Sequence, residues 1–258
     1  MLKNIRNSTF LLVAALVVLI PATATTAAPQ SVITVNSLAD DLDLNGNCTL
    51  REALWAANYN FTRDGCAAGS TIGSDSIVFS VNGAINMALG QFTIISPVTI
   101  QGNGRSQTII DAGGDSRIFN VVPTDPPQTV RLESMTLQNG ASSSGGAIQL
   151  VTGYLPNLIL ELDDVIIQDS WAGFGGAISY GWTSATKIIN SLLQRNTADQ
   201  AGGAISAGAG LFIEDSVIQN NQVTSVEANP LGGGGIYSDY AEVTITRTLI
   251  QGNRAVNS

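Results

Sequence analysis

"IINSLLQRNTADQAGGAI", residues 188–205, sets a pattern that much of the chain repeats. Its first half returns later as "IEDSVIQNN" and "ITRTLIQGN", and it occurs earlier as "LESMTLQNG" and "LDDVIIQDS". These copies share one Gln, at Gln138, Gln168, Gln194, Gln219 and Gln251, and "ISPVTIQGN" aligns as a sixth through Gln101. Gly-Gly-Ala-Ile begins at Gly145, Gly175 and Gly202, and Gly-Gly-Gly-Ile begins at Gly233. Self-similarity at spacings of roughly 20 to 50 residues is the signature of a repeat protein.

The aliphatic residues of these segments predict strands rather than helices. Leu or Ile stands directly before every aligned Gln, and again at the sixth place before it. The runs are short and broken by Gly and Asn, whereas a helix needs apolar residues at a spacing of 3.6 over about ten residues. Fixed aliphatic positions can face one interior when successive units stack in parallel, about 4.8 Å apart. The sequence therefore predicts an all-β protein, a single-stranded parallel β-helix over residues 72–258.

The polar and glycine positions of the repeat suit its turns. The Asn two places after the Gln, as in Asn196, tolerates the left-handed backbone conformation. The paired glycines are expected to bend the chain where a Cβ would clash, so that the following Ala and Ile turn inward. These roles are structural, and we expect no catalytic role for the Gln or Asn positions.

The stretch "NCTLREALWAAN", residues 47–58, predicts a helix close to the start of the mature chain. Thr49 and Glu52 form a capping-box pattern. An apolar face follows at helical spacing, made by Leu50, Ala53, Leu54 and Ala57. A helix over roughly residues 50–59 would cover the open first turn of the solenoid, which would otherwise expose its core. We therefore expect an N-terminal cap over residues 31–71.

Acidic residues before this helix match a calcium-loop pattern. Asp41, Asp43, Asn45, Gly46 and Glu52 satisfy D-x-[DN]-x-[DN]-G-x5-E, in which oxygen ligands gather around Ca²⁺. No amphipathic helix precedes Asp41, as it would in such a motif. The alternative is a solvated acidic turn with ordinary helix capping. Calcium is the one cofactor that the sequence suggests.

Targeting signals and cysteines indicate an exported protein. Lys3 and Arg6 precede an apolar run and a small-residue segment, which is the layout of a signal peptide over residues 1–24, with cleavage after Ala24 or Ala28. An uncleaved membrane anchor is the alternative. In an oxidising compartment the two cysteines, Cys48 and Cys66, are expected to form a disulfide. Their spacing is not C-x-x-C and the chain contains no His, which disfavours a redox or metal pair.

The charge limits the classes of partner. The net charge is −9 and only 12% of residues are charged. Removing the signal peptide would also remove two basic residues, so the mature chain would be more acidic still. Nucleic acids and anionic membranes are therefore unfavourable partners. We expect a monomer that associates with membranes only indirectly, through an anchor or barrel outside this sequence.

Two motifs together resemble a group of bacterial surface proteins. "NCTLREALWAAN" is similar to the N-terminal Cys-Ser-Leu-Arg-Glu-Ala motif, with Thr49 in place of Ser and Leu54 where Ile is common. The GGAI units resemble the repeats of chlamydial polymorphic outer membrane proteins, GGA[ILV] with F-x-x-N. The Phe of that pattern is replaced here by Leu193, Ile218 or Ile250. The resemblance covers nearly the whole mature chain.

The resemblance implies a right-handed, pectin-lyase-like β-helix that is secreted or lies at the bacterial cell surface or outer membrane. It carries no catalytic residues to this chain, because the matching motifs are structural. It favours a non-catalytic adhesin or passenger, a binding surface for glycans or cell-surface partners. The last residues, "QGNRAVNS", stop within a repeat, so we expect the solenoid to be truncated there.

The alternative function is that of a polysaccharide lyase or glycoside hydrolase. Such an enzyme needs two carboxylates about 5 to 9.5 Å apart, or acids that hold calcium beside a base. Asp163, Asp164 and Asp215 are the candidate acids, and Asp164 and Asp215 occupy the same place in units two turns apart, about 9.6 Å at the inter-strand spacing. Asn190 fills this place in the intervening unit, and basic partners are scarce.

Aromatic residues cluster around one unit and suggest a place for sugar stacking. They are Trp171, Phe174, Tyr180 and Trp182. Exposed aromatic rings can pack on sugar rings or anchor a protein partner, and loops between solenoid repeats often carry binding. Burial of these rings against a neighbouring loop is the alternative.

Overall fold

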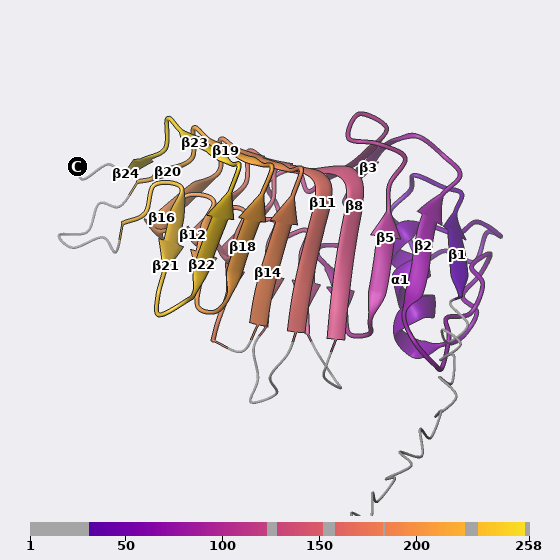
Figure 1. Ribbon diagram of the computed structural model, residues 1–258. Helices are drawn as coiled ribbons and strands as arrows, with labels where there is room; N and C mark the ends of the chain where they lie inside the picture. Colours follow the sequence, from indigo (N-terminus) through magenta and orange to yellow (C-terminus); the bar gives the residue numbers. More distant parts are fainter. Residues whose placement is uncertain (1–30, 123–127, 152–157, 183, 225–231, 256–258) are drawn as a thin grey trace, which may run out of the picture.

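The computed structural model describes residues 31–122, 128–151, 158–182, 184–224 and 232–255, and in them the chain winds as a right-handed parallel β-helix (Figure 1). Successive turns stack along one axis, from the helix α1 at one end to β24 at the other. Neighbouring strands pair in parallel, and the described strands form sheets of 13, 6 and 5 strands. The predicted fold class is confirmed.

The longest sheet contains two arms that meet at a corner. The first arm contains β1 (Val32–Val35), β2 (Asp75–Phe79), β5 (Val98–Gln101), β8 (Gln128–Gln138), β11 (Leu158–Gln168), β14 (Ser184–Ile189), β18 (Leu211–Glu214) and β22 (Val243–Thr246). The second arm contains β3 (Gly83–Asn86), β6 (Thr108–Asp111), the ends of β8 and β11, β15 (Leu192–Gln194), β19 (Val217–Gln219) and β23 (Leu249–Gln251). We call this the long sheet.

Two smaller sheets close the solenoid. The second sheet contains β4 (Phe92–Ile94), β7 (Phe119–Val121), β10 (Ile148–Leu150), β13 (Ile178–Tyr180), β17 (Ile205–Ala207) and β21 (Ile236–Ser238). The third sheet contains β9 (Ala141–Ser144), β12 (Trp171–Phe174), β16 (Thr197–Ala201), β20 (Gln222–Val223) and β24 (Arg254–Ala255). Each full turn therefore visits all three sheets.

The repeated aliphatic positions form two continuous ladders in the interior. One ladder runs in register through Leu132, Leu162, Ile188, Ile213 and Ile245. The other runs through Leu137, Ile167, Leu193, Ile218 and Ile250. All are buried except the last member of each, Ile245 and Ile250, which lie on the final described turn and are 41% and 46% exposed. Because side chains alternate between the two faces of a strand, this burial fixes the register.

The aligned segment that contains Gln101 does not pair in the register of the other five. Gln101 pairs with Glu133 and not with Gln138, so the alignment of "ISPVTIQGN" with the later units is wrong. The residue beside Gln138 is instead Asp111 of β6. Here the first arm and the second arm are separate strands, β5 and β6, joined by a loop. The local sequence resembles the repeat, but the pairing is set by this longer connection.

The glycine pairs bend the chain as expected. The first glycine of each pair has a positive φ, from 59° at Gly145 to 72° at Gly233. A Cβ on the second glycine would meet backbone of the next turn. At Gly203 it would lie 2.6 Å from the backbone nitrogen of Gln222 and against the carbonyl oxygen of Gly234. The following Ala and Ile are buried at Ala147, Ile148, Ala177, Ile178, Ala204 and Ile205.

The Asn positions make a buried ladder, and the prediction that they adopt the left-handed conformation is wrong. The left-handed residue is the one before, such as Arg195 (φ 53°) and Asn220 (φ 54°). Asn196 and Asn221 are fully buried. The Oδ1 atom of Asn221 accepts hydrogen bonds from the backbone N–H and from the Nδ2 of Asn196, at 2.9 and 3.0 Å. These side chains satisfy backbone groups that the turn leaves unpaired.

The glutamines form a second ladder on the outside. Each Nε2 donates to the Oε1 of the previous Gln, from Gln251 through Gln219, Gln194 and Gln168 to Gln138. Gln138 then donates to Asp111 Oδ2 at 2.7 Å. Like side chains stacked at the inter-strand spacing can pair in this way along the whole solenoid.

Helix α1 (Leu50–Tyr59) covers the N-terminal end, as predicted. Thr49 and Glu52 form both hydrogen bonds of the capping box. The four residues of its predicted apolar face are buried and belong to the common core, Leu50, Ala53, Leu54 and Ala57. The Cys48–Cys66 disulfide is present and fixes the segment after the helix to its start. Strand β1 pairs with β2, so the cap continues the long sheet.

A buried ion pair fastens the helix to the first turn. The Nε and Nη2 atoms of Arg51 donate to the two carboxylate oxygens of Asp40, at 2.6 and 2.9 Å. Arg51 also donates to the carbonyl oxygens of Gly90 and Gln91. Burial alone would raise the pKa of Asp40. The hydrogen bonds from Arg51 and from the backbone N–H groups of residues 88 and 89 outweigh burial and hold this pKa below its ordinary 3.8.

This ion pair predicts a pH dependence of stability. Because the pKa of Asp40 is lower in the folded state, its contribution is complete above the unfolded pKa and is lost as the pH falls through the folded pKa. We expect Asp40→Asn to lower the free energy of unfolding at neutral pH by about 3 kcal/mol. This difference should narrow below about pH 3.8. Urea denaturation of both proteins at several pH values measures it, and a difference that stays constant into acid would contradict the assignment.

The signal peptide and its two cleavage positions lie outside the described residues, as do the last residues of the chain, 256–258. Within the described ranges, α1 is too short and too polar to span a bilayer, and there is no other helix that could do so.

Candidate functional site

The candidate catalytic acids lie at the corner of the long sheet. Asp164 and Asp215 have φ values of 58° and 48°, and Asn190 between them has a φ of 49°. They therefore share one structural position, as the repeat predicted. Asp and Asn adopt the left-handed conformation more readily than most residues. The backbone of this corner is thus sufficient reason for an acid or amide at each of these places.

Arginines from neighbouring turns neutralise two of these acids. The Oδ1 atom of Asp164 lies 2.7 Å from the Nε of Arg105. Asp163 lies on the strand face beside it, where its Oδ2 is 3.2 Å from the Nη2 of Arg131. Its other oxygen accepts a hydrogen bond from the Nδ2 of Asn190 at 3.0 Å. Each of these two carboxylates is thus engaged by an arginine and by a second polar side chain, which is Ser134 for Asp164 and Asn190 for Asp163.

The third acid is also held by an arginine. The Nε and Nη2 atoms of Arg247 donate to the two oxygens of Asp215, at 2.7 and 2.8 Å, and Arg247 also pairs with Glu214. The hydrogen bond from Arg247 holds the pKa of Asp215 below its ordinary value. A glycosidase's acid needs a raised pKa. Asp215 in this pairing is therefore unsuited to donate a proton at neutral pH.

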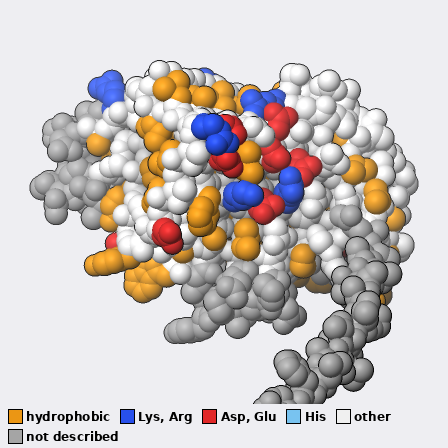
Figure 2. Space-filling view, in the orientation of Figure 1, with side chains coloured by type: hydrophobic (Ala, Val, Ile, Leu, Met, Phe, Trp, Pro, Cys, Tyr) orange, Lys and Arg blue, Asp and Glu red, His pale blue; other side chains and the backbone are white. Residues whose placement is uncertain are grey.

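These pairs form one patch of mixed charge on the long sheet. Figure 2 shows red and blue side chains gathered together over the middle of this face, while most of the surrounding surface is white or orange. Opposite charges on adjacent strands stabilise cross-strand pairing modestly. The arginines, which the sequence did not associate with these acids, reach them across turns.

The predicted calcium residues are not gathered around one point. Glu52 is fully buried, and its Oε2 accepts hydrogen bonds from the backbone N–H and hydroxyl of Thr49. Asp41 accepts a hydrogen bond from the backbone N–H of Asp43, and Asn45 accepts one from a backbone N–H two residues on. Among the described residues, no group of three or more His, Cys, Asp or Glu side chains is placed to hold a metal ion. The calcium loop stays a prediction.

Chelation separates the two interpretations of this loop. Because Glu52 is engaged in the capping box, we expect the melting temperature to be the same with and without EDTA. Ligands that bind only the folded state raise stability, so a bound calcium ion would show itself as a loss on chelation. A melting temperature that falls in EDTA and returns with added calcium would show that the loop rearranges around the ion.

The predicted aromatic cluster is not one surface. Tyr180 is buried and its hydroxyl donates to the carbonyl oxygen of Gly210. Trp171 and Phe174 lie on β12 of the third sheet, and the Nε1 of Trp171 donates to Asp199. Trp182 follows β13 and is 75% exposed. Of these four, only Trp182 borders the groove described next.

Three stacked turn tips form a groove. The tips lie between β13 and β14, between β17 and β18, and between β21 and β22, and backbone hydrogen bonds join them. The outer tips carry Trp182 and Tyr240, and the middle tip is Gly208, Ala209 and Gly210. The groove has a volume of about 390 Å³. A small-residue tip thus lies between two aromatic tips, whose backbones are about 9.6 Å apart at twice the strand spacing. We call the small residues the floor of the groove and the two aromatic side chains its walls.

Tyr240 has a backbone conformation that is unfavourable for a bulky aromatic residue. It is 97% exposed and has a φ of 58°, in the left-handed region. A bulky residue in this region costs of the order of 1 to 3 kcal/mol, and such residues cluster at functional sites. A Cβ on Gly208 would lie 2.9 Å from the backbone of Gly181 and 2.9 Å from the Cδ1 atom of Trp182, so the Trp182 ring lies close to the floor. Figure 2 shows orange side chains near the β21–β22 end, away from the charged patch.

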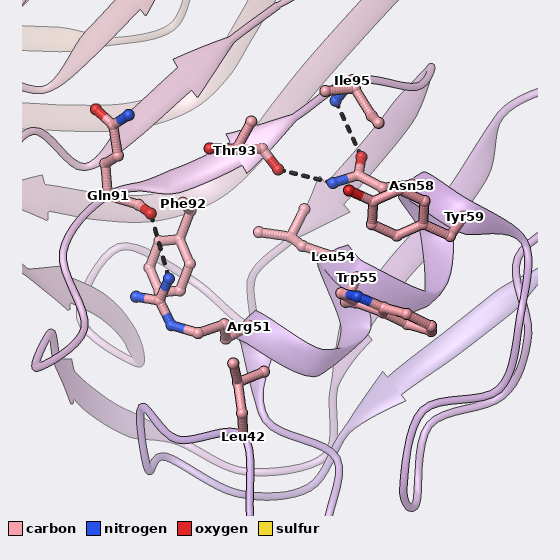
Figure 3. A pocket seen from close by; sticks show the side chains of 10 residues that line it. All are labelled: Leu42, Arg51, Leu54, Trp55, Asn58, Tyr59, Gln91, Phe92, Thr93 and Ile95. Carbon is pink, nitrogen blue, oxygen red and sulfur yellow. Dashed lines mark hydrogen bonds between the residues drawn. The ribbon is translucent and has the colours of Figure 1, made fainter.

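A second hollow lies beside the capping helix. Figure 3 shows Trp55 and Tyr59 at its edge, and its volume is about 230 Å³. In this hollow the Nδ2 of Asn58 donates to the carbonyl oxygen of Thr93, and its Oδ1 accepts from the backbone N–H of Ile95. Arg51 is committed to Asp40 and to backbone carbonyl groups, as described above. The hydrogen bonds of Arg51 and Asn58 in this hollow thus hold the helix against the first turn.

Comparisons with known proteins add no relative: no family model matches the chain, and neither a curated protein nor a solved structure matches it. The resemblance to bacterial surface proteins stays a prediction.

Proposed function

We propose that this protein is a secreted or cell-surface β-helix that binds glycans without cleaving them, and that the Trp182–Tyr240 groove is its binding site. One observation carries the proposal. Two exposed aromatic rings, one of them on a strained backbone, flank a floor of Gly and Ala. Sugar rings present apolar C–H faces that pack on aromatic rings, and ligand sites combine such walls with few polar groups.

The state of the acids supports the non-catalytic part of the proposal. Asp163, Asp164 and Asp215 are each paired with an arginine. Arginine does not lose its proton in proteins, so it is a poor base for a lyase reaction. The pKa of Arg247 is raised further by its hydrogen bonds to Asp215 and Glu214. The polysaccharide lyase or hydrolase remains the alternative that an activity assay must exclude.

Removing one wall of the groove tests the binding site. We expect Trp182→Ala to lower the affinity for a bound oligosaccharide about tenfold or more, a loss of about 1.4 kcal/mol. Trp171→Ala is the matched control, because Trp171 is also exposed but lies on another sheet. Calorimetric titration of both variants measures the effect, and equal affinities for wild type and Trp182→Ala would exclude this groove.

Tyr240→Gly gives an independent check on the same site. Glycine relieves the left-handed strain, which offsets the entropy that it adds to the unfolded chain, so stability should change by less than about 1 kcal/mol. Affinity should nevertheless fall, because the second wall is lost. A variant that binds normally would show that Tyr240 is not part of the site.

A further inference from the structure

The charge of the groove differs from that of the sheet face. Glu242 lines the groove and Asp239 directly precedes Tyr240. Throughout the described part of the chain, the acids of the charged patch are paired with arginines, whereas neither Glu242 nor Asp239 has an ion-pair partner. Among the described residues, no basic side chain lines the groove. The groove is therefore a place of uncompensated negative charge on a protein that is already acidic.

The aromatic walls add to this preference for positive charge. The face of an aromatic ring carries a negative partial charge and attracts a cation within about 6 Å of the ring centre, most strongly for Trp. A carboxylate nearby attracts the same cation by direct Coulomb interaction. The net charge of −9 would also raise the rate at which a cationic ligand reaches the surface.

We propose that the ligands of this groove are glycans with free, protonated amino groups, such as oligomers of glucosamine. This inference rests on the proposed function and names the substrate class of the same site. In such a ligand the sugar ring stacks between Trp182 and Tyr240, and its ammonium group lies near Glu242. N-acetylation removes the positive charge and leaves the ring unchanged, so it removes only the electrostatic part of the interaction.

The test compares a glucosamine oligomer with the N-acetylated oligomer of the same length, by calorimetric titration of the full chain. We expect the free-amine form to bind about tenfold more tightly and to lose this advantage as the salt concentration rises. Glu242→Gln should reduce the tenfold preference to less than about threefold. Its melting temperature should stay unchanged, because Glu242 is exposed and unpaired.

The outcomes separate this inference from the proposed function. Equal affinity for the two oligomers, with binding lost in Trp182→Ala, would overturn the preference for amines and leave glycan binding intact. Tighter binding of the N-acetylated form would overturn it as well. If neither oligomer nor any other glycan bound, both the inference and the proposed function would be overturned. A preference that survives in Glu242→Gln would show that Glu242 does not cause it.

Discussion

Gly176→Ala is expected to destabilise the solenoid strongly. A Cβ on Gly176 would lie 2.5 Å from the carbonyl oxygen and 2.7 Å from the backbone nitrogen of Thr197, and against the carbonyl oxygen of Gly203. These are backbone atoms of the next turn, held in parallel ladders, so they cannot move aside as a flexible side chain could. We expect the free energy of unfolding to fall by about 3 kcal/mol or more, measured by urea denaturation.

Gly210→Ala is the matched control for this change. A Cβ on Gly210 would lie 3.4 Å from the nearest ring atom of Phe212 and 3.7 Å from the Cβ of Ala185, which are tolerable contacts. The same substitution should therefore leave stability within about 1 kcal/mol of wild type, because Ala reduces the entropy of the unfolded chain. If Gly176→Ala and Gly210→Ala had the same effect, close packing of the turns at the glycine pairs would be wrong.

Asn221→Ala is expected to destabilise the solenoid to a similar extent, because it removes buried hydrogen bonds. It would remove the acceptor of the Asn196 backbone N–H, and one of the two acceptors of the Asn196 Nδ2, which keeps the carbonyl oxygen of Ile167. It would also remove the Nδ2 that donates to the carbonyl oxygen of Leu193. Asn196 and Asn221 are fully buried, so water cannot replace Asn221 without rearrangement. Each buried group left unpaired costs about 1 to 3 kcal/mol, which gives a total of about 3 kcal/mol or more.

A serine in an earlier turn suggests a control substitution for the asparagine ladder. Ser170 occupies the same position one turn before Asn196, and its Oγ accepts a hydrogen bond from the backbone N–H of Gly140. Asn221→Ser should therefore keep the acceptor for the N–H of Asn196 and lose less stability than Asn221→Ala. Equal losses for Ser and Ala would mean that packing, and not hydrogen bonding, explains the asparagine at this position.

The sequence predicted the parts of the fold that depend on local and periodic signals. The ladder through Leu137 and Ile167 follows from a repeat whose register cannot slip without exposing the core. The capping box and the Cys48–Cys66 disulfide follow from a short pattern and a cysteine count. These features need no knowledge of which distant segments meet.

What the sequence did not predict depends on contacts across turns. Gln101 was misaligned because its local motif matches the later repeats while its strand pairs elsewhere. Arg105 reaches Asp164 from an earlier turn, and no spacing rule links them. The groove was missed because Trp182 and Tyr240 come from different turns. The signal in the sequence is the alignment of the turn tips. It places an aromatic residue, then small residues, then a second aromatic residue at the same position of three successive turns.

We propose that function resides in the aromatic groove and not in the corner acids, and one measurement tells the two sites apart. The full chain, Trp182→Ala and the double variant Asp164→Asn/Asp215→Asn are incubated with anionic, neutral and amino polysaccharides. Both retention on the polymer and release of reducing or unsaturated ends are measured. Asn190 already occupies the corner position, so the double variant should fold. We predict no release by any protein, with retention lost only in Trp182→Ala. Ends released by the wild type and not by the double variant would show that the corner acids are catalytic and would contradict the proposed function.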